Sequence, residues 1–91
     1  MKIGTREISL KQTPLVIAEI GINHGGKLDT AKAMVHAAYK AGAECVKHQT
    51  HFVEDEMTEE AKTIFPPNAD ISIWDVINNS SLSKDEEIDL K

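Results

Sequence analysis

Aromatic residues, cysteine and positive charge are all scarce in this 91-residue sequence. Aromatic residues make up 4% of the chain, which leaves little material for a surface that stacks nucleic-acid bases. The formal net charge of −5 argues against nucleic acid or an anionic membrane as a partner. No run approaches the ~20 apolar residues of a membrane span, and no signal peptide is visible. We therefore expect a cytoplasmic protein.

The single cysteine, Cys45, cannot form an internal disulfide, which fits a reducing cytoplasm. Nothing in the sequence marks an activating partner, so a small core residue is a better interpretation than a nucleophile. The chain is 41% hydrophobic and 27% charged, which is ordinary for a globular protein. Its length is enough for one small domain.

Residues 14–51 predict a strand, a helix and a second strand. The run 15–22 is apolar on both faces, as in a parallel strand that is covered on both sides. A helix is expected over about 28–41 from its apolar spacing, with Gly42 as its C-terminal cap. The segment 43–51 then predicts a second strand. A short return of this kind gives a right-handed βαβ unit.

Weaker signals flank this unit. Residues 1–13 predict a lead-in hairpin. Residues 52–91 predict a long acidic loop and the start of a second helical layer, with a short helix near 58–65, an amphipathic segment at 71–79 and a capping box at 83–86. A two-stranded parallel sheet with so little cover is not expected to be stable alone. The fold class predicted is therefore α/β, as the N-terminal piece of a larger protein.

Polar residues gather where the two predicted strands end, and in parallel α/β folds chemistry collects at these carboxyl ends. Glu19 is the only charge in the first strand. Side chains alternate along a strand, so Lys47, Gln49 and His51 share one face of the second, while His48 lies on the other. A lysine in a short apolar strand indicates an anion: a phosphate, a carboxylate or Glu19 itself. The residues alone leave a functional site and a structural ion pair equally open.

Three histidines, His24, His48 and His51, lie near these strand ends. Because His48 and His51 are expected to face opposite ways, hydrogen-bonded structural histidines are a better interpretation than a metal site. The pair Gly25–Gly26 lacks the spacing of a nucleotide-binding loop. We expect it to form a loop near the active site.

The segments 19–26 and 46–51 resemble the sialic acid synthases, also called N-acetylneuraminate synthases. The resemblance continues through 53–57 and 67–73, so it covers nearly the whole chain from Pro14 onward. It implies that residues 1–91 are an incomplete N-terminal portion of a (β/α)8 TIM barrel, namely its first two β/α units. The antifreeze-like C-terminal domain of the family would then be absent.

The resemblance also implies an activity. Family members are homodimers that condense phosphoenolpyruvate with N-acetylmannosamine and water to give N-acetylneuraminate and phosphate, using Mn²⁺ or Mg²⁺. The resemblance implies catalytic roles for Glu19 and Lys47, with Lys47 meeting phosphoenolpyruvate and Glu19 contacting the sugar. It places Gln49 near the sugar and the metal-bound water, and it assigns Asn68 to sugar binding. The metal ligands of the family have no counterpart among these 91 residues, so we expect the isolated chain to be inactive.

Two alternatives stay open. One is a legionaminic or pseudaminic acid synthase that uses a related amino sugar. The other is a truncated, non-catalytic remnant. The specific role of Glu19, which is either to order a sugar hydroxyl or to order the attacking water, is also left open.

Overall fold

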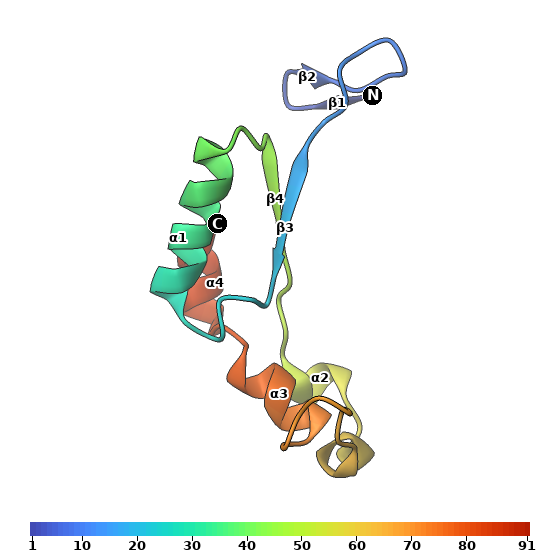
Figure 1. Ribbon diagram of the computed structural model, residues 1–91, viewed down its shortest axis with the longest axis vertical. Helices are drawn as coiled ribbons and strands as arrows, with labels where there is room; N and C mark the ends of the chain where they lie inside the picture. Colours follow the sequence, from blue (N-terminus) through green and yellow to red (C-terminus); the bar gives the residue numbers. More distant parts are fainter.

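Two parallel strands form the centre of the chain (Figure 1). In the computed structural model, which describes residues 1–91, β3 (Ile17–Gly21) pairs in parallel with β4 (Cys45–His48). Helix α1 (Leu28–Lys40) connects the two strands. The predicted order of strand, helix and strand is thus confirmed.

The register of the two strands contains a bulge. Glu19 lies opposite Lys47, but Gly21 rather than Ile20 lies opposite His48, so β3 carries one extra residue. Gly21 has a φ of 53°, in the left-handed region that glycine tolerates, and the chain turns directly after it. The bulge therefore sits at the carboxyl end of β3, where the polar residues gather.

Helix α1 has the signals that its sequence predicts. Asp29 lies in its first turn and Lys40 in its last, and both charges suit the helix dipole. Ala41 is the C-cap, and Gly42 follows with a φ of 94°. Tyr39, near the end of the helix, is exposed. The apolar residues of the helix therefore extend beyond the part of it that packs against the strands.

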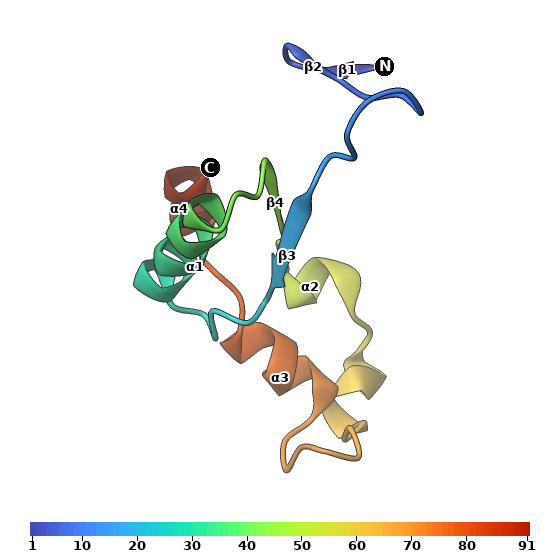
Figure 2. The same cartoon turned by 45° about the horizontal axis from the view of Figure 1, so that its top comes forward.

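Helix α1 and helix α4 (Lys84–Leu90) lie on the same side of the two strands (Figures 1 and 2). Ile20, which faces them, is buried, whereas Val16 and Ile17 remain more than half exposed. The helices of these 91 residues therefore cover one face of the strand, and the cover predicted for its other face does not come from them. The radius of gyration, 16.3 Å, exceeds the about 12 Å of a compact chain of this length. The architecture is therefore open.

A small antiparallel hairpin precedes this unit and lies at one end of the molecule (Figure 1). Its strands are β1 (Lys2–Ile3) and β2 (Arg6–Glu7). The guanidinium of Arg6 holds the hairpin to the start of β4, because it donates to the Glu44 carboxylate at 2.6 Å and to the carbonyl oxygen of Thr13 at 2.7 Å. The partnership with Glu44 raises the pKa of Arg6.

The remainder of the chain is more helical than its acidic sequence suggests. Helix α2 (Val53–Glu56) stands where an acidic loop was expected, and the 3-10 helix η1 (Glu59–Thr63) confirms the short helix predicted near 58–65. The three carboxylates of α2 suit the N-terminal end of its dipole, and the buried Val53 anchors the turn. Helices α3 (Ile73–Asn79) and α4 (Lys84–Leu90) follow.

The last helix begins with the predicted capping box. The Ser83 hydroxyl accepts from the Glu86 amide at 3.2 Å, and the Ser83 amide donates to the Glu86 carboxylate at 2.8 Å. Few side chains form the core: the buried apolar residues are Ile20, Ala31, Val53, Ala61 and Leu82. None of the helices has both the length and the apolar character that a membrane crossing demands.

Candidate functional site

Two groups of polar side chains lie at the carboxyl ends of β3 and β4. The open-face cluster consists of Glu19, Lys47, Gln49, His51 and Glu56. The helix-side cluster consists of His24, His48, Thr50 and Glu87. Side chains continue to alternate between the two faces beyond the end of β4, as predicted. Gln49 and His51 bond to each other on one face, and His48 and Thr50 both bond to Glu87 on the other.

An ion pair forms the base of the open-face cluster. Glu19 and Lys47 are directly opposite in the register, with Lys47 Nζ 3.4 Å from Glu19 Oε1. In this chain their side chains are 56% and 60% exposed. The reason is that no helix covers this face of the sheet (Figure 2).

That exposure bears on whether the pair is structural. An ion pair this open contributes about 0–1 kcal/mol to folding. A stabilising role is therefore weak, and the Lys47 ammonium keeps room for a second anion beside Glu19. In this chain the Lys47 ammonium is thus accessible to a ligand.

Three side chains form a chain of contacts beyond the ion pair. His51 Nδ1 lies 2.7 Å from Glu56 Oε1, and His51 Nε2 lies 3.1 Å from Gln49 Oε1. Glu56 belongs to α2, so the helical turn that the sequence did not predict supplies one member of the cluster. Glu56 and His51 were not predicted as partners, although a pairing at five residues' separation is within reach of sequence reasoning.

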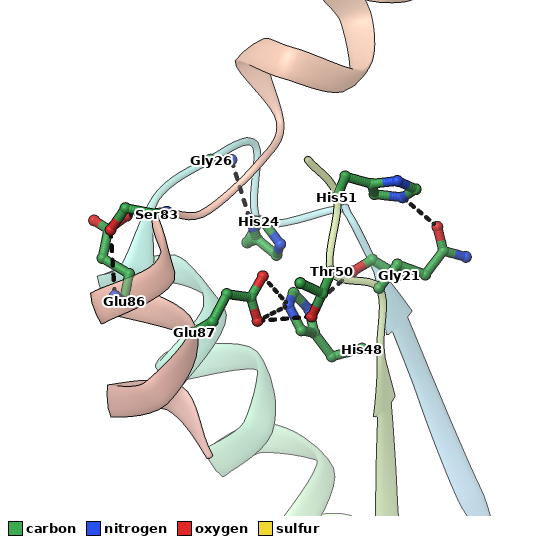
Figure 3. Close-up of polar contacts among 10 residues, drawn as sticks. Gly21, His24, Gly26, His48, Thr50, His51, Ser83, Glu86 and Glu87 are labelled. Carbon is green, nitrogen blue, oxygen red and sulfur yellow. Dashed lines mark hydrogen bonds and ion pairs between the residues drawn. The ribbon is translucent and has the colours of Figure 1, made fainter. Parts of the chain in front are cut away.

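The helix-side cluster ties α4 to the end of β4 (Figure 3). His48 Nε2 lies 2.9 Å from Glu87 Oε2, and His48 Nδ1 lies 3.2 Å from the carbonyl oxygen of Gly21. The Thr50 hydroxyl donates to Glu87 Oε2 at 2.9 Å. Glu87 is 39 residues from His48, and no local pattern in the sequence could have identified it.

His24 is almost entirely buried, at 2% exposure. Its Nδ1 accepts from the Gly26 amide at 3.0 Å, and its ring packs against that of His48 with centroids 5.2 Å apart. Its Nε2 has no hydrogen-bond partner. Burial lowers the pKa of His24, the neighbouring His48 lowers it further, and Glu87 opposes both effects.

The residues present do not fit a metal ion. No three side chains among the chain's histidines, cysteine and carboxylates converge in a way that could hold one. His24, His48 and His51 instead bond to a backbone amide or to carboxylates. Apart from His24 Nε2, their ring nitrogens are thus engaged in hydrogen bonds rather than directed at a common point.

The fourth predicted site residue, Asn68, lies in an exposed turn between η1 and α3. No hydrogen bond or ion pair joins it to Glu19, Lys47 or Gln49. A groove of about 580 Å³ lies on the other side of the sheet, between α1, β4 and α4. Its lining combines apolar side chains, such as those of Val46 and Ile88, with the charged side chains of Lys84, Glu87 and Lys91.

Comparisons with known proteins give a consistent result, although no family model matches the chain. The spore coat polysaccharide biosynthesis protein SpsE of Bacillus subtilis is 35% identical over 83 residues, covering 89% of this chain and 22% of that protein. Its crystal structure aligns with 99% of this chain and 23% of its own, at a TM-score of 0.64 and 29% identity.

Two further relatives are named as synthases. The N,N'-diacetyllegionaminic acid synthase of Legionella pneumophila is 45% identical over 47 residues, which is 52% of this chain and 13% of that enzyme. The N-acetylneuraminate-9-phosphate synthase of Homo sapiens is 46% identical over 46 residues, which is 50% of this chain and 13% of that enzyme. The chain spans less than a quarter of the length of each of these proteins. Together with the motifs at the two strand ends, these matches show that the chain is similar to part of the sialic acid synthases.

Proposed function

We propose that this chain supplies the ends of the first two strands of a (β/α)8 barrel that condenses phosphoenolpyruvate with an amino sugar. The unit β3–α1–β4 and the incomplete unit ending in α4 would be the first two β/α units, preceded by the hairpin of residues 1–13. The observation that supports this most strongly is the open ion pair of Lys47 and Glu19, 3.4 Å apart at the carboxyl ends of parallel strands.

The proposed reaction forms one carbon–carbon bond. The CH₂ carbon of phosphoenolpyruvate attacks the aldehyde carbon of the open-chain sugar, water adds at the carbon that bears the phosphate group, and the bond from that carbon to phosphate breaks. Phosphoenolpyruvate carries a carboxylate and a phosphate, and the exposed Lys47 ammonium attracts such a ligand. Glu19 holds the ammonium in position from the neighbouring strand and is oriented to order either a sugar hydroxyl or the attacking water.

The remaining assignments belong to the same proposal. Gln49 and Asn68 bind the sugar, the working protein is a cytoplasmic homodimer, and the acceptor is N-acetylmannosamine. We assign the Mn²⁺ or Mg²⁺ of this chemistry to ligands outside these 91 residues, because no suitable group of side chains converges within them. The identity to an N,N'-diacetyllegionaminic acid synthase favours a diacetamido sugar as the second candidate acceptor.

The test replaces Lys47 with alanine in the full-length synthase that carries this chain. We expect phosphate release from phosphoenolpyruvate, with the amino sugar present, to fall about 100-fold or more, because one charged contact to the reacting ligand is lost. The matched control is Lys32→Ala, which breaks a similarly exposed ion pair, 2.8 Å long, between α1 and Asp89 of α4.

The control should retain wild-type turnover, and circular dichroism should show that both variants remain folded. Phosphate release by Lys47→Ala within threefold of the control would refute the assignment of Lys47. Comparing N-acetylmannosamine with its diacetamido relatives as acceptors separates the two candidate sugars. A wild-type protein that releases no phosphate with either acceptor would support the non-catalytic alternative.

A further inference from the structure

We propose that Glu56 is a positioning residue that places Asn68 for binding the amino sugar. Its bond to His51 sets the lobe that carries Asn68 against the end of β4. This lobe consists of residues 52–81 and includes α2, η1 and α3, with α2 and α3 beyond the carboxyl ends of the two strands (Figure 1). The inference rests on the proposed function and adds to it the contact that aligns one sugar-binding residue with the rest of the site.

The lobe is held together by its own contacts. Helix α3 packs against both η1 and α2, and Lys62 Nζ of η1 lies 4.6 Å from the centre of the Trp74 ring of α3. The amide of Ile73 donates to the carbonyl oxygen of Ile64 at 2.7 Å and so closes the base of the segment in which Asn68 lies. Asn68 is therefore fixed within the lobe, and its place relative to the strand ends depends on how the lobe is attached.

Few contacts attach the lobe to the strands. None of its three helices packs against β3 or β4. At the α3 end, Gly26 lies so close that a side chain on it would collide with the carbonyl oxygen of Asn79. At the α2 end, Glu56 Oε1 lies 2.7 Å from His51 Nδ1, and this is the only hydrogen bond or ion pair between the lobe and the rest of the chain. Glu56 therefore controls the end of the lobe that Gly26 does not hold.

The bond between Glu56 and His51 suits this role in more than one state of the ring. The charged ring and the neutral ring with its proton on Nδ1 both donate to the carboxylate. The side chains of His51 and Glu56 are 19% and 34% exposed, so water competes with this bond less than with the Glu19–Lys47 pair. His51 Nε2 lies 3.1 Å from Gln49 Oε1, so the lobe is tied down beside the other proposed sugar-binding residue.

The kinetic experiment replaces Glu56 with alanine in the full-length synthase. We expect the KM for the amino sugar to rise about tenfold, with the KM for phosphoenolpyruvate unchanged, because Lys47 is not affected. The matched control is Glu54→Ala on the same helix, whose side chain forms no hydrogen bond or ion pair and which should match wild type. A sugar KM for Glu56→Ala within threefold of this control, or an equal rise in both KM values, would overturn the inference.

A double-mutant cycle shows whether the effect of Glu56 passes through Asn68. In an Asn68→Ala background, Glu56→Ala should raise the sugar KM less than threefold, because the lobe no longer carries the side chain that binds the sugar. A rise of threefold or more in that background would overturn the inference. Asn68→Ala alone tests the proposed function, because an unchanged sugar KM in this variant would refute the assignment of Asn68 itself. The two failures are therefore distinguishable.

A distance measurement tests the placement of the lobe apart from turnover. Nitroxide labels are attached through Asp70→Cys in the lobe and His36→Cys on α1, two exposed positions, in full-length synthase whose other reactive cysteines are replaced. The distribution of distances between the labels should be narrow with Glu56 intact and in Glu54→Ala, and it should broaden in Glu56→Ala. An equally narrow and unshifted distribution in Glu56→Ala would overturn the inference, and so would a broad one with Glu56 intact.

Discussion

Glu87 is the side chain whose removal should most weaken the attachment of α4. It accepts from the Thr50 hydroxyl at 2.9 Å and bonds to His48 Nε2 through both of its oxygens, at 2.9 and 3.0 Å. The side chains of His48 and Glu87 are largely shielded from water. Glu87→Ala therefore leaves both the Thr50 hydroxyl and His48 Nε2 without this partner. His48 is shielded, so water cannot easily replace the lost bond.

The expected magnitude can be worked from these contacts. A hydrogen bond to a charged group is worth about 1.5–3 kcal/mol, and a shielded donor left without its acceptor adds to the cost. The two bonds share one carboxylate and are not additive, so we expect about 2–4 kcal/mol for Glu87→Ala. Asp85→Ala, in the same helix and with no side-chain bond, should cost below about 1 kcal/mol through the helix dipole.

Amide hydrogen exchange measures this directly, because α4 can open without unfolding the rest of the chain. The amides of Glu87 and Lys91, which bond to Ser83 and Glu87 carbonyl oxygens, should exchange about 30- to 1000-fold faster in Glu87→Ala. The amides within β3 and α1 should change much less. Exchange in α4 that is no faster than in Asp85→Ala would refute the view that Glu87 fastens this helix.

Two further outcomes are expected. Gly26→Ala should lower the melting temperature far more than Gly25→Ala. Both glycines have a positive φ, but only a side chain at Gly26 would collide with the carbonyl oxygen of Asn79. Equal losses of melting temperature in the two variants would refute this steric argument. Because burial lowers the pKa of His24, its neutral ring stabilises the fold above pH ~6.5 and this contribution is lost as the pH falls below that value. His24→Asn, which retains an acceptor for the Gly26 amide, should flatten the fall in melting temperature on acidification; an unchanged slope would contradict the assignment.

The sequence predicted what depends on near neighbours. The bounds of α1, the cap at Gly42 and the capping box at Ser83 follow from residues within a few positions of one another, and the structure has them all. The facing of Glu19 and Lys47 was also within reach, because two parallel strands joined by one helix bring equivalent positions together.

The features that the sequence did not predict depend on contacts between residues far apart in the sequence or on which surfaces the helices cover. The bond from Glu87 to His48 joins residues whose partnership exists only after α4 has packed. The apolar residues of β3 suggested two covered faces, but the helices lie on one side only, so Lys47 is exposed. Helix α2 was mistaken for an acidic loop, because carboxylates that repel in an extended chain are favoured in a first helical turn.

The extra residue in β3 makes the chemistry of this region sensitive to chain length. Glu19 and Gly21 project the same way along β3, yet their partners Lys47 and His48 project opposite ways along β4. The carbonyl oxygen of Gly21 therefore lies within hydrogen-bond distance of both His48 Nδ1, at 3.2 Å, and the backbone N–H of Gln49, at 3.4 Å. A single-residue deletion between Glu19 and Gly21 would remove this bulge and draw the Gly21 carbonyl oxygen away from one of these two partners.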